Sequence, residues 1–98
     1  MEADRALEVI RECVGAGRFT VSRHFTKRMD KRGLFWPDVL AVLGDPKRVT
    51  ADGLDSYDRP KWIVGGSTSD GFPIEVVCVL DEDSRGRVTV FVTIYWKD

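Results

Sequence analysis

The sequence has little histidine or cysteine and no long apolar run, and each shortage excludes a class of protein. One histidine among 98 residues cannot supply the several imidazoles of most histidine-based metal sites. The two cysteines, Cys13 and Cys78, stand far apart beside apolar residues, so we expect reduced core thiols and neither a disulfide nor a metal ligand. No stretch approaches the roughly 20 apolar residues of a membrane helix, and the acidic start lacks the apolar run of a signal peptide. We therefore expect a cytoplasmic protein with no metal, cofactor or membrane partner.

The length and composition indicate an ordinary globular protein with a single core. Hydrophobic residues make up 43% of the 98 residues and charged residues 32%, which is typical of folded proteins. A chain of this length has room for one hydrophobic core. We therefore expect one domain over residues 1–98.

The net charge of −1 hides an uneven distribution of charge. Residues 18–32 contain six basic residues and one acid, whereas the rest of the chain contains nine basic residues and fifteen acids. A basic segment on an acidic body argues against a general nucleic-acid binder but favours a local anion-binding surface.

The first half of the sequence predicts helices. Residues 3–14 place apolar side chains at the spacing of one helix face. A short β-prone segment at 19–22 leads to Ser22, a good N-cap, and a second helix is expected at 23–32 with Gly33 as its stop. A third helix is expected to follow, with Pro37 at its first position.

After residue 46 the apolar period changes from helical to alternating. Asp70-Gly71 suits a hairpin turn, and the other breaks are polar. The expected strands are a weak one at 47–51 and clearer ones at 61–67, 72–80 and 87–96.

The last strand decides the expected architecture. Its even positions, from Val88 to Trp96, are all apolar, whereas its odd positions include Thr93 and Tyr95. We therefore expect helices to cover the even face and leave the odd face partly open. The predicted fold is α+β, with two or three N-terminal helices packed on one face of an antiparallel meander of about four strands.

The second predicted helix carries the candidate site. His24, Arg28 and Arg32 recur every four residues and share one side of the helix, with Lys27 and Lys31 beside them. Guanidinium groups in such a row can bind phosphates bidentately, and neighbouring cations favour the neutral imidazole, which can act as a base. The alternative is a solvated helix face with no ligand.

Three other residues each have a possible functional role and a possible structural role. Thr93 and Tyr95 on the odd face can position a phosphate or a ribose, but both residue types are also common in strands. Trp62 can serve as a stacking platform for a base, or it can be a core residue at the end of a strand.

Residues 21–33 carry the pattern Ser-x-His-x-x-x-Arg-Met-x-x-Arg-Gly. With this motif the chain resembles a small bacterial family known as domain of unknown function 4258. The likeness covers roughly residues 18–96, which leaves 1–17 as an additional N-terminal helix. It continues in three further segments, at residues 38–43, 73–80 and 92–95.

The resemblance implies a fold and an activity. The family is grouped with BrnT and the RelE/ParE toxins, so a RelE/BrnT-like fold and a small ribonuclease (mRNA interferase) of a toxin–antitoxin pair are implied. RNA or the ribosome would be the target, and an antitoxin protein would be the partner. The positions that the resemblance implies for the site are His24, Arg28, Arg32, Thr93 and Tyr95.

The leading hypothesis is therefore a metal-independent endoribonuclease. His24, Arg28 and Tyr95 are the expected catalytic residues, with the arginine stabilising charge and the other two assisting proton transfer. The expected RNA-binding residues are Arg32, Lys27, Lys31, Thr93 and Trp62.

Two rival hypotheses stay open. In the first, the protein is a non-catalytic module whose basic helix docks on RNA or on an acidic protein, and Phe91 seals a homodimer or partner interface. In the second, the chain is a diverged toxin-like domain that has lost its activity, which its slightly acidic net charge would fit.

Overall fold

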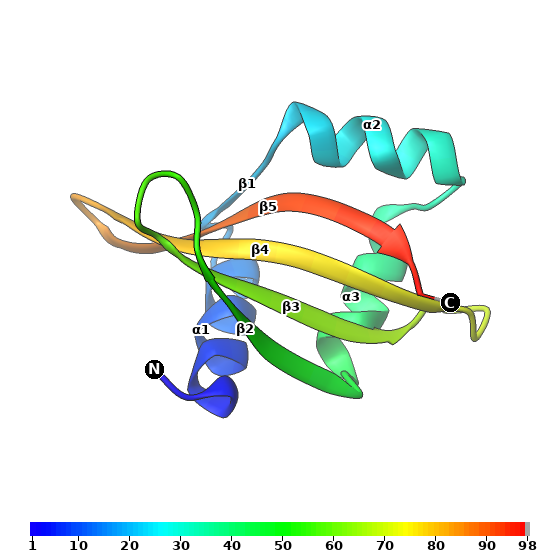
Figure 1. Ribbon diagram of the computed structural model, residues 1–98, viewed down its shortest axis with the longest axis horizontal. Coiled ribbons are helices and arrows are strands. Elements are labelled where there is room, and N and C mark those ends of the chain that lie inside the picture. Colours follow the sequence, from blue (N-terminus) through cyan, green and yellow to red (C-terminus); the bar gives the residue numbers. More distant parts are fainter. Residues whose placement is uncertain (98) are drawn as a thin grey trace.

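A computed structural model describes residues 1–97 as three helices and five strands (Figure 1). The α+β class is confirmed, and each expected helix is present within a few residues of its predicted bounds. In chain order the elements are α1 (Ala3–Gly15), β1 (Phe19–Val21), α2 (Arg23–Arg32), α3 (Trp36–Gly44), β2 (Arg48–Leu54), β3 (Pro60–Ser67), β4 (Pro73–Asp83) and β5 (Gly86–Trp96).

The strands form one mixed sheet in the order β1-β5-β4-β3-β2. Strands β2 to β5 are the expected antiparallel meander. The sheet nevertheless has five strands where about four were predicted. The additional strand is β1, whose three residues pair parallel with residues 89–91 of β5.

Two helices cover one face of the sheet, and in Figure 1 they lie behind it. The apolar stripe of α1 buries Val9 and Ile10, and α3 buries Val39 and Val42. The remaining helix, α2, departs from the prediction. It lies alongside β5 (Figure 1) and contributes Phe25 to the core. Within residues 1–97, the opposite face of the sheet therefore carries no helix.

A glycine on β3 sets the distance between α3 and the sheet. A Cβ atom at Gly66 would lie 3.3 Å from Cγ1 of Val42 and 3.5 Å from the carbonyl oxygen of Asp45. The first of these contacts is tighter than ordinary van der Waals packing, so a side chain at this position would require Val42 to move by a few tenths of an ångström.

Strand β5 contains a β-bulge at Val92. Cys78 of β4 pairs with Phe91, and the preceding Val77 pairs with Thr93, so Val92 is one residue more than the ladder needs. Since side chains alternate between the two faces, an additional residue reverses which positions face the core.

The predicted core face of β5 is therefore wrong before the bulge and right after it. Thr89 and Phe91 are fully buried, whereas Val88 and Val90 are partly exposed. After the bulge the even-numbered Ile94 is buried, as expected.

The interface role predicted for Phe91 is also wrong. This side chain has no exposed surface, and its ring lies 5.6 Å from that of Phe25 and 5.4 Å from that of Trp36. It is the centre of an aromatic cluster inside the protein and is not available to a partner.

The reversed face can be tested by comparing two truncations in β5. We expect Phe91→Ala to lower the free energy of unfolding by about 3–5 kcal/mol, because it empties a fully buried site. Val90→Ala should cost less than half of that, because Val90 lies on the helix-free face. Urea unfolding measures both values, and a greater loss for Val90→Ala would contradict the bulge.

Candidate functional site

Ser22 fixes the start of α2. Its hydroxyl oxygen accepts a hydrogen bond from the backbone N–H of Phe25 at 3.0 Å, as the predicted N-cap requires. The same hydroxyl donates to the carbonyl oxygen of Val92 at 2.9 Å, and the Ser22 N–H donates to that of Phe91 at 3.0 Å. One residue thus joins the beginning of α2 to the bulge of β5. At the other end, Gly33 stops the helix in the left-handed conformation, with φ of 65°.

Four of the predicted side chains meet on α2. His24, Lys27, Arg28 and Lys31 line one shallow surface hollow. The Nε–H of Arg28 donates to Nε2 of His24 at 3.4 Å. In this contact the imidazole is an acceptor, and within residues 1–97 neither terminal nitrogen of Arg28 has a hydrogen-bond partner.

The α2 cations have no acidic partners within residues 1–97. The basic residues of this helix are Arg23, Lys27, Arg28, Lys31 and Arg32, and none of them forms an ion pair with a carboxylate in that range. The positive charge of this helix is therefore not neutralised by the described part of the protein.

Arg32 does not join this group. It is half-buried, and its Nη1 atom is shielded from solvent with no hydrogen-bond partner in the described part of the chain. A successive rotation of about 40° for every four residues of a helix carries Arg32 away from His24. The predicted row of three is thus a contact between His24 and Arg28, with Arg32 apart from it.

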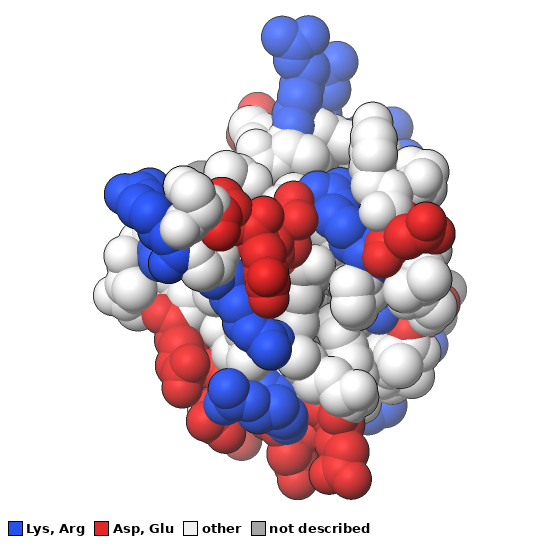
Figure 2. All heavy atoms as spheres, turned by 90° about the vertical axis from the view of Figure 1, so that its left-hand side faces the viewer, with Lys and Arg blue, Asp and Glu red and all other residues white. Residues whose placement is uncertain are grey.

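Two arginines at the other end of the molecule are paired with acids. Arg59 forms ion pairs with Asp55 at 2.7 Å and with Asp81 at 3.1 Å, and Arg18 is paired with Asp83. Figure 2 shows this side, where positive and negative side chains are intermixed. Burial opposes ionisation of Asp55, but hydrogen bonds from Arg59 and Tyr57 outweigh it and lower the pKa of the carboxyl. The α2 cations, which have no acidic partner within residues 1–97, therefore contrast with these two paired arginines.

Thr93 and Tyr95 lie on the helix-free face of the sheet, as expected. They are partly exposed, and the residues opposite them on β4 are Val77 and Glu75. Among residues 1–97 no hydrogen bond joins either side chain to His24, so the structure places the predicted residues in two separate groups.

The environment of Tyr95 favours the protonated phenol. Burial raises the pKa of Tyr95 above its ordinary value, and the negative charge of Glu75 and hydrogen bonding with Glu75 raise it further. At neutral pH the phenol is therefore a hydrogen-bond donor and not a base.

Trp62 lies on the other side of the sheet. It is 5% exposed, belongs to the core beneath the helices, and pairs with Cys78 in the sheet. A buried indole cannot stack on a base, so the predicted stacking role does not fit this position. The core alternative describes it.

Sequence reasoning missed three residues near Tyr95. Glu75 is buried, and its carboxylate pairs with Arg48 and with Lys97. The one available signal was an acid within an otherwise apolar strand, between Ile74 and Val76. The two cations gave no comparable signal.

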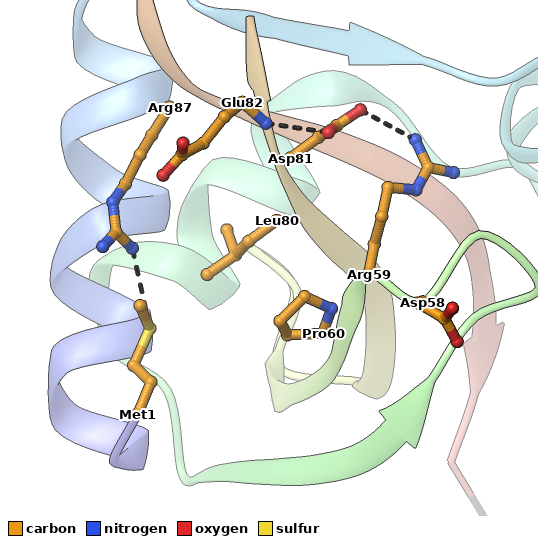
Figure 3. Close-up of a pocket in the computed structure, with 8 residues that line it drawn as sticks. All are labelled: Met1, Asp58, Arg59, Pro60, Leu80, Asp81, Glu82 and Arg87. Atoms are coloured by element: carbon orange, nitrogen blue, oxygen red, sulfur yellow. Dashed lines mark hydrogen bonds and ion pairs between the residues drawn. The ribbon is translucent and has the colours of Figure 1, made fainter.

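A separate pocket of about 360 Å³ lies between the N-terminus and the β4–β5 hairpin (Figure 3). Its basic residue Arg59 is held by Asp81, and the Nη1 of Arg87 contacts the sulfur of Met1 at 3.9 Å. It contains none of the predicted site residues. It is a weaker candidate than α2, because Arg59 and Asp81 of its lining neutralise each other.

The described residues contain neither a cluster of metal ligands nor a membrane-spanning helix. No group of three or more His, Cys, Asp or Glu side chains within residues 1–97 is arranged to hold a metal ion. No helix in this range is both long and apolar enough to cross a membrane.

Comparison with known proteins identifies one family. The family model described as "Domain of unknown function (DUF4258)" matches residues 21–96, which is well over half of the chain. The match begins three residues after the expected start at residue 18. No curated protein matches the chain.

The link made by Ser22 can be tested by removing its hydroxyl. We expect Ser22→Ala to lower the free energy of unfolding by about 1–2 kcal/mol, because the helix loses its cap and Val92 loses a donor. Urea unfolding gives the value. Thr26→Ala is the control, because its exposed hydroxyl donates only to the backbone oxygen of Ser22 in the same helical turn and does not reach β5. An equal loss in both variants would contradict the link.

The influence of Glu75 on Tyr95 can be measured directly. The chain has two tyrosines, so Tyr57→Phe leaves Tyr95 as the only phenol, and its near-ultraviolet absorbance reports its titration. In that background we expect Glu75→Gln to lower the pKa of Tyr95, because the neighbouring negative charge is removed.

The same shift has a consequence for stability. Because the folded-state pKa of Tyr95 is raised, its contribution is present below the ordinary value of about 10 and is lost as the pH rises through the folded-state value. An unchanged titration in Glu75→Gln, with circular dichroism showing a folded chain, would contradict the coupling.

Proposed function

We propose that this chain, which belongs to the DUF4258 family, binds RNA on α2 and cleaves it as a metal-independent endoribonuclease of the toxin–antitoxin type. The observation that carries the proposal is the hollow on α2, where His24 lies among three cations that have no acidic partner within residues 1–97. The RelE/BrnT-like fold is part of this proposal. The helices and the antiparallel meander support it, as does the motif resemblance.

Binding would come from the phosphates of RNA. Cations without internal partners can neutralise phosphates and so release the counterions that are condensed on the RNA. This release favours association and makes it sensitive to salt. Lys27 and Lys31 act as point charges, whereas Arg28 can place two parallel N–H groups on one phosphate.

Cleavage would use the neighbouring 2′-hydroxyl as the nucleophile. The 2′-oxygen forms a bond to phosphorus while the bond to the 5′-oxygen breaks, which leaves a 2′,3′-cyclic phosphate and a 5′-hydroxyl. His24 accepts the proton of the 2′-hydroxyl, and Arg28 stabilises the charge that develops on the phosphate. Tyr95, as a protonated phenol, would donate to the leaving 5′-oxygen when the RNA extends from α2 to the helix-free face, where Thr93 holds the backbone.

One observation favours the non-catalytic alternative. Nε2 of His24 accepts the hydrogen bond from Arg28, so the lone pair that a general base needs is occupied in this structure. In that alternative the same patch binds RNA or an acidic protein without turnover. Catalysis requires Arg28 to move from the imidazole to the phosphate when RNA binds.

The partner expected from the toxin reading is an antitoxin. A protein that places carboxylates on the α2 cations would neutralise them and block access to RNA. The unpaired charges of Lys27 and Lys31 make this helix the surface on which we propose that such a partner docks.

Purified variants test the enzymatic proposal with single-stranded RNA in the presence of EDTA. We expect the wild-type chain to give products with 5′-hydroxyl ends. His24→Ala should lower the cleavage rate by about 10²–10⁴-fold with unchanged RNA affinity, because it removes the proposed base. Arg28→Gln should lower the rate by about 10²–10³-fold through loss of charge stabilisation.

Arg23→Gln is the matched control, because it removes the same charge from α2 outside the hollow. Induced expression in a bacterium adds a second measurement, with growth arrest expected for the wild-type chain and not for His24→Ala. RNA binding without cleavage would establish the binding module. The absence of both RNA binding and growth arrest would refute the proposal.

A further inference from the structure

A second cluster of charged side chains lies on the helix-free face of the sheet, apart from the cations of α2. Glu75 is 8% exposed and is the one buried carboxylate among residues 1–97. In the sheet it lies between Gly65 of β3 and Tyr95 of β5. Burying a carboxylate is costly unless it is paired, so its partners matter.

Each oxygen of this carboxylate holds a different cation. Oε2 lies 3.5 Å from Nη2 of Arg48 on β2, and Oε1 lies 3.5 Å from Nζ of Lys97, which follows β5. Glu75 therefore draws together two cations from separate strands, which would repel each other without it.

Gly65 makes this arrangement possible. A Cβ atom at this position would lie 3.1 Å from Nη2 of Arg48 and 3.4 Å from Oε2 of Glu75. The guanidinium group of Arg48 crosses β3 where no side chain obstructs it. Any larger residue would force the ion pair to shift.

The cluster has more positive charge than it needs for its own neutralisation. Two cations share one carboxylate, the reverse of the Arg59 cluster, where one cation is shared by two carboxylates. The side chains of Arg48 and Lys97 are 50% and 48% exposed, so each keeps free N–H donors toward solvent. Tyr95, which pairs with Glu75 in the sheet, adds a protonated phenol next to the carboxylate.

We infer that Arg48, Lys97 and Tyr95 form a second anion site, held in place by Glu75, that binds a phosphate group. Glu75 is a positioning residue, since it acts by holding the two cations and the phenol. That the phosphate belongs to RNA rests on the proposed function. The site itself stands on the geometry of the cluster.

A purely structural cluster would behave differently. It would tie β2, β4 and the end of β5 together without binding an anion, and its loss would lower stability alone. Binding measurements on folded variants therefore separate the two cases.

The first experiment titrates the ¹⁵N-labelled full-length chain with inorganic phosphate and follows amide chemical shifts. We expect the backbone amides of Gly65, Glu75 and Tyr95 to shift together. Arg48→Gln should weaken this response about tenfold, the effect of losing a charge-assisted hydrogen bond. Lys47→Gln, a neighbouring loss of the same charge from an exposed residue, should leave it unchanged.

Glu75→Gln separates positioning from simple electrostatics. The substitution increases the net positive charge of the face, so a surface that only attracts anions would bind phosphate more tightly. We expect weaker binding, because the two cations lose the group that holds them. Tighter binding, or no shifts at Gly65, Glu75 and Tyr95 in the wild-type chain, would overturn the inference.

A second experiment measures binding of 2′-O-methyl RNA, which cannot be cleaved by the proposed route, as a function of salt. Arg48→Gln and Lys97→Gln should each weaken binding and reduce the salt slope by about one, whereas Lys47→Gln should not. Circular dichroism confirms that each variant is folded.

The two proposals can fail separately. Phosphate shifts at the cluster without any RNA binding would refute the proposed function and support the site. RNA binding that depends on α2 alone, without phosphate shifts at the cluster, would refute the site and leave the proposed function standing.

Discussion

The additional residue in β5 at Val92 is the constraint from which the rest of the arrangement follows. It turns Phe91 into the core and places Thr93 and Tyr95 on the opposite face. Its carbonyl oxygen receives the hydroxyl of Ser22, where β1 ends and α2 begins. Without the bulge, the odd positions of β5 would remain on one face throughout, and the aromatic cluster and the tyrosine would compete for the same side of the sheet.

The position of α2 explains why its charges stay unpaired. The other two helices lie against the sheet and bury one whole face in the core. Helix α2 runs beside β5 and buries mainly Phe25 and Met29. A helix with so narrow a buried stripe leaves most of its circumference in solvent. On the helix-free face of the sheet, by contrast, two cations meet a buried carboxylate.

The helices could be predicted from local sequence signals. The site could be predicted only in part, because the positions of some of its residues depend on tertiary packing. Ser22 as a cap and Gly33 as a stop define α2 from the sequence, because both depend on neighbouring backbone groups. The bulge left no clear signal, since both faces of residues 88–92 are rich in apolar side chains and either could be buried. Arg32 shares the four-residue spacing but lies against the protein, and Trp62 depends on which face of β3 meets the helices; neither can be read from spacing alone.

Two adjacent glycines of β3 serve opposite sides of the sheet. Gly66 admits the close approach of α3, and Gly65 admits the guanidinium group of Arg48. Neighbouring positions in a strand point to opposite faces, so hydrophobic packing and surface electrostatics are separated here by a single peptide unit. A substitution at either glycine would therefore disturb one face of the sheet and leave the packing on the other face as it is.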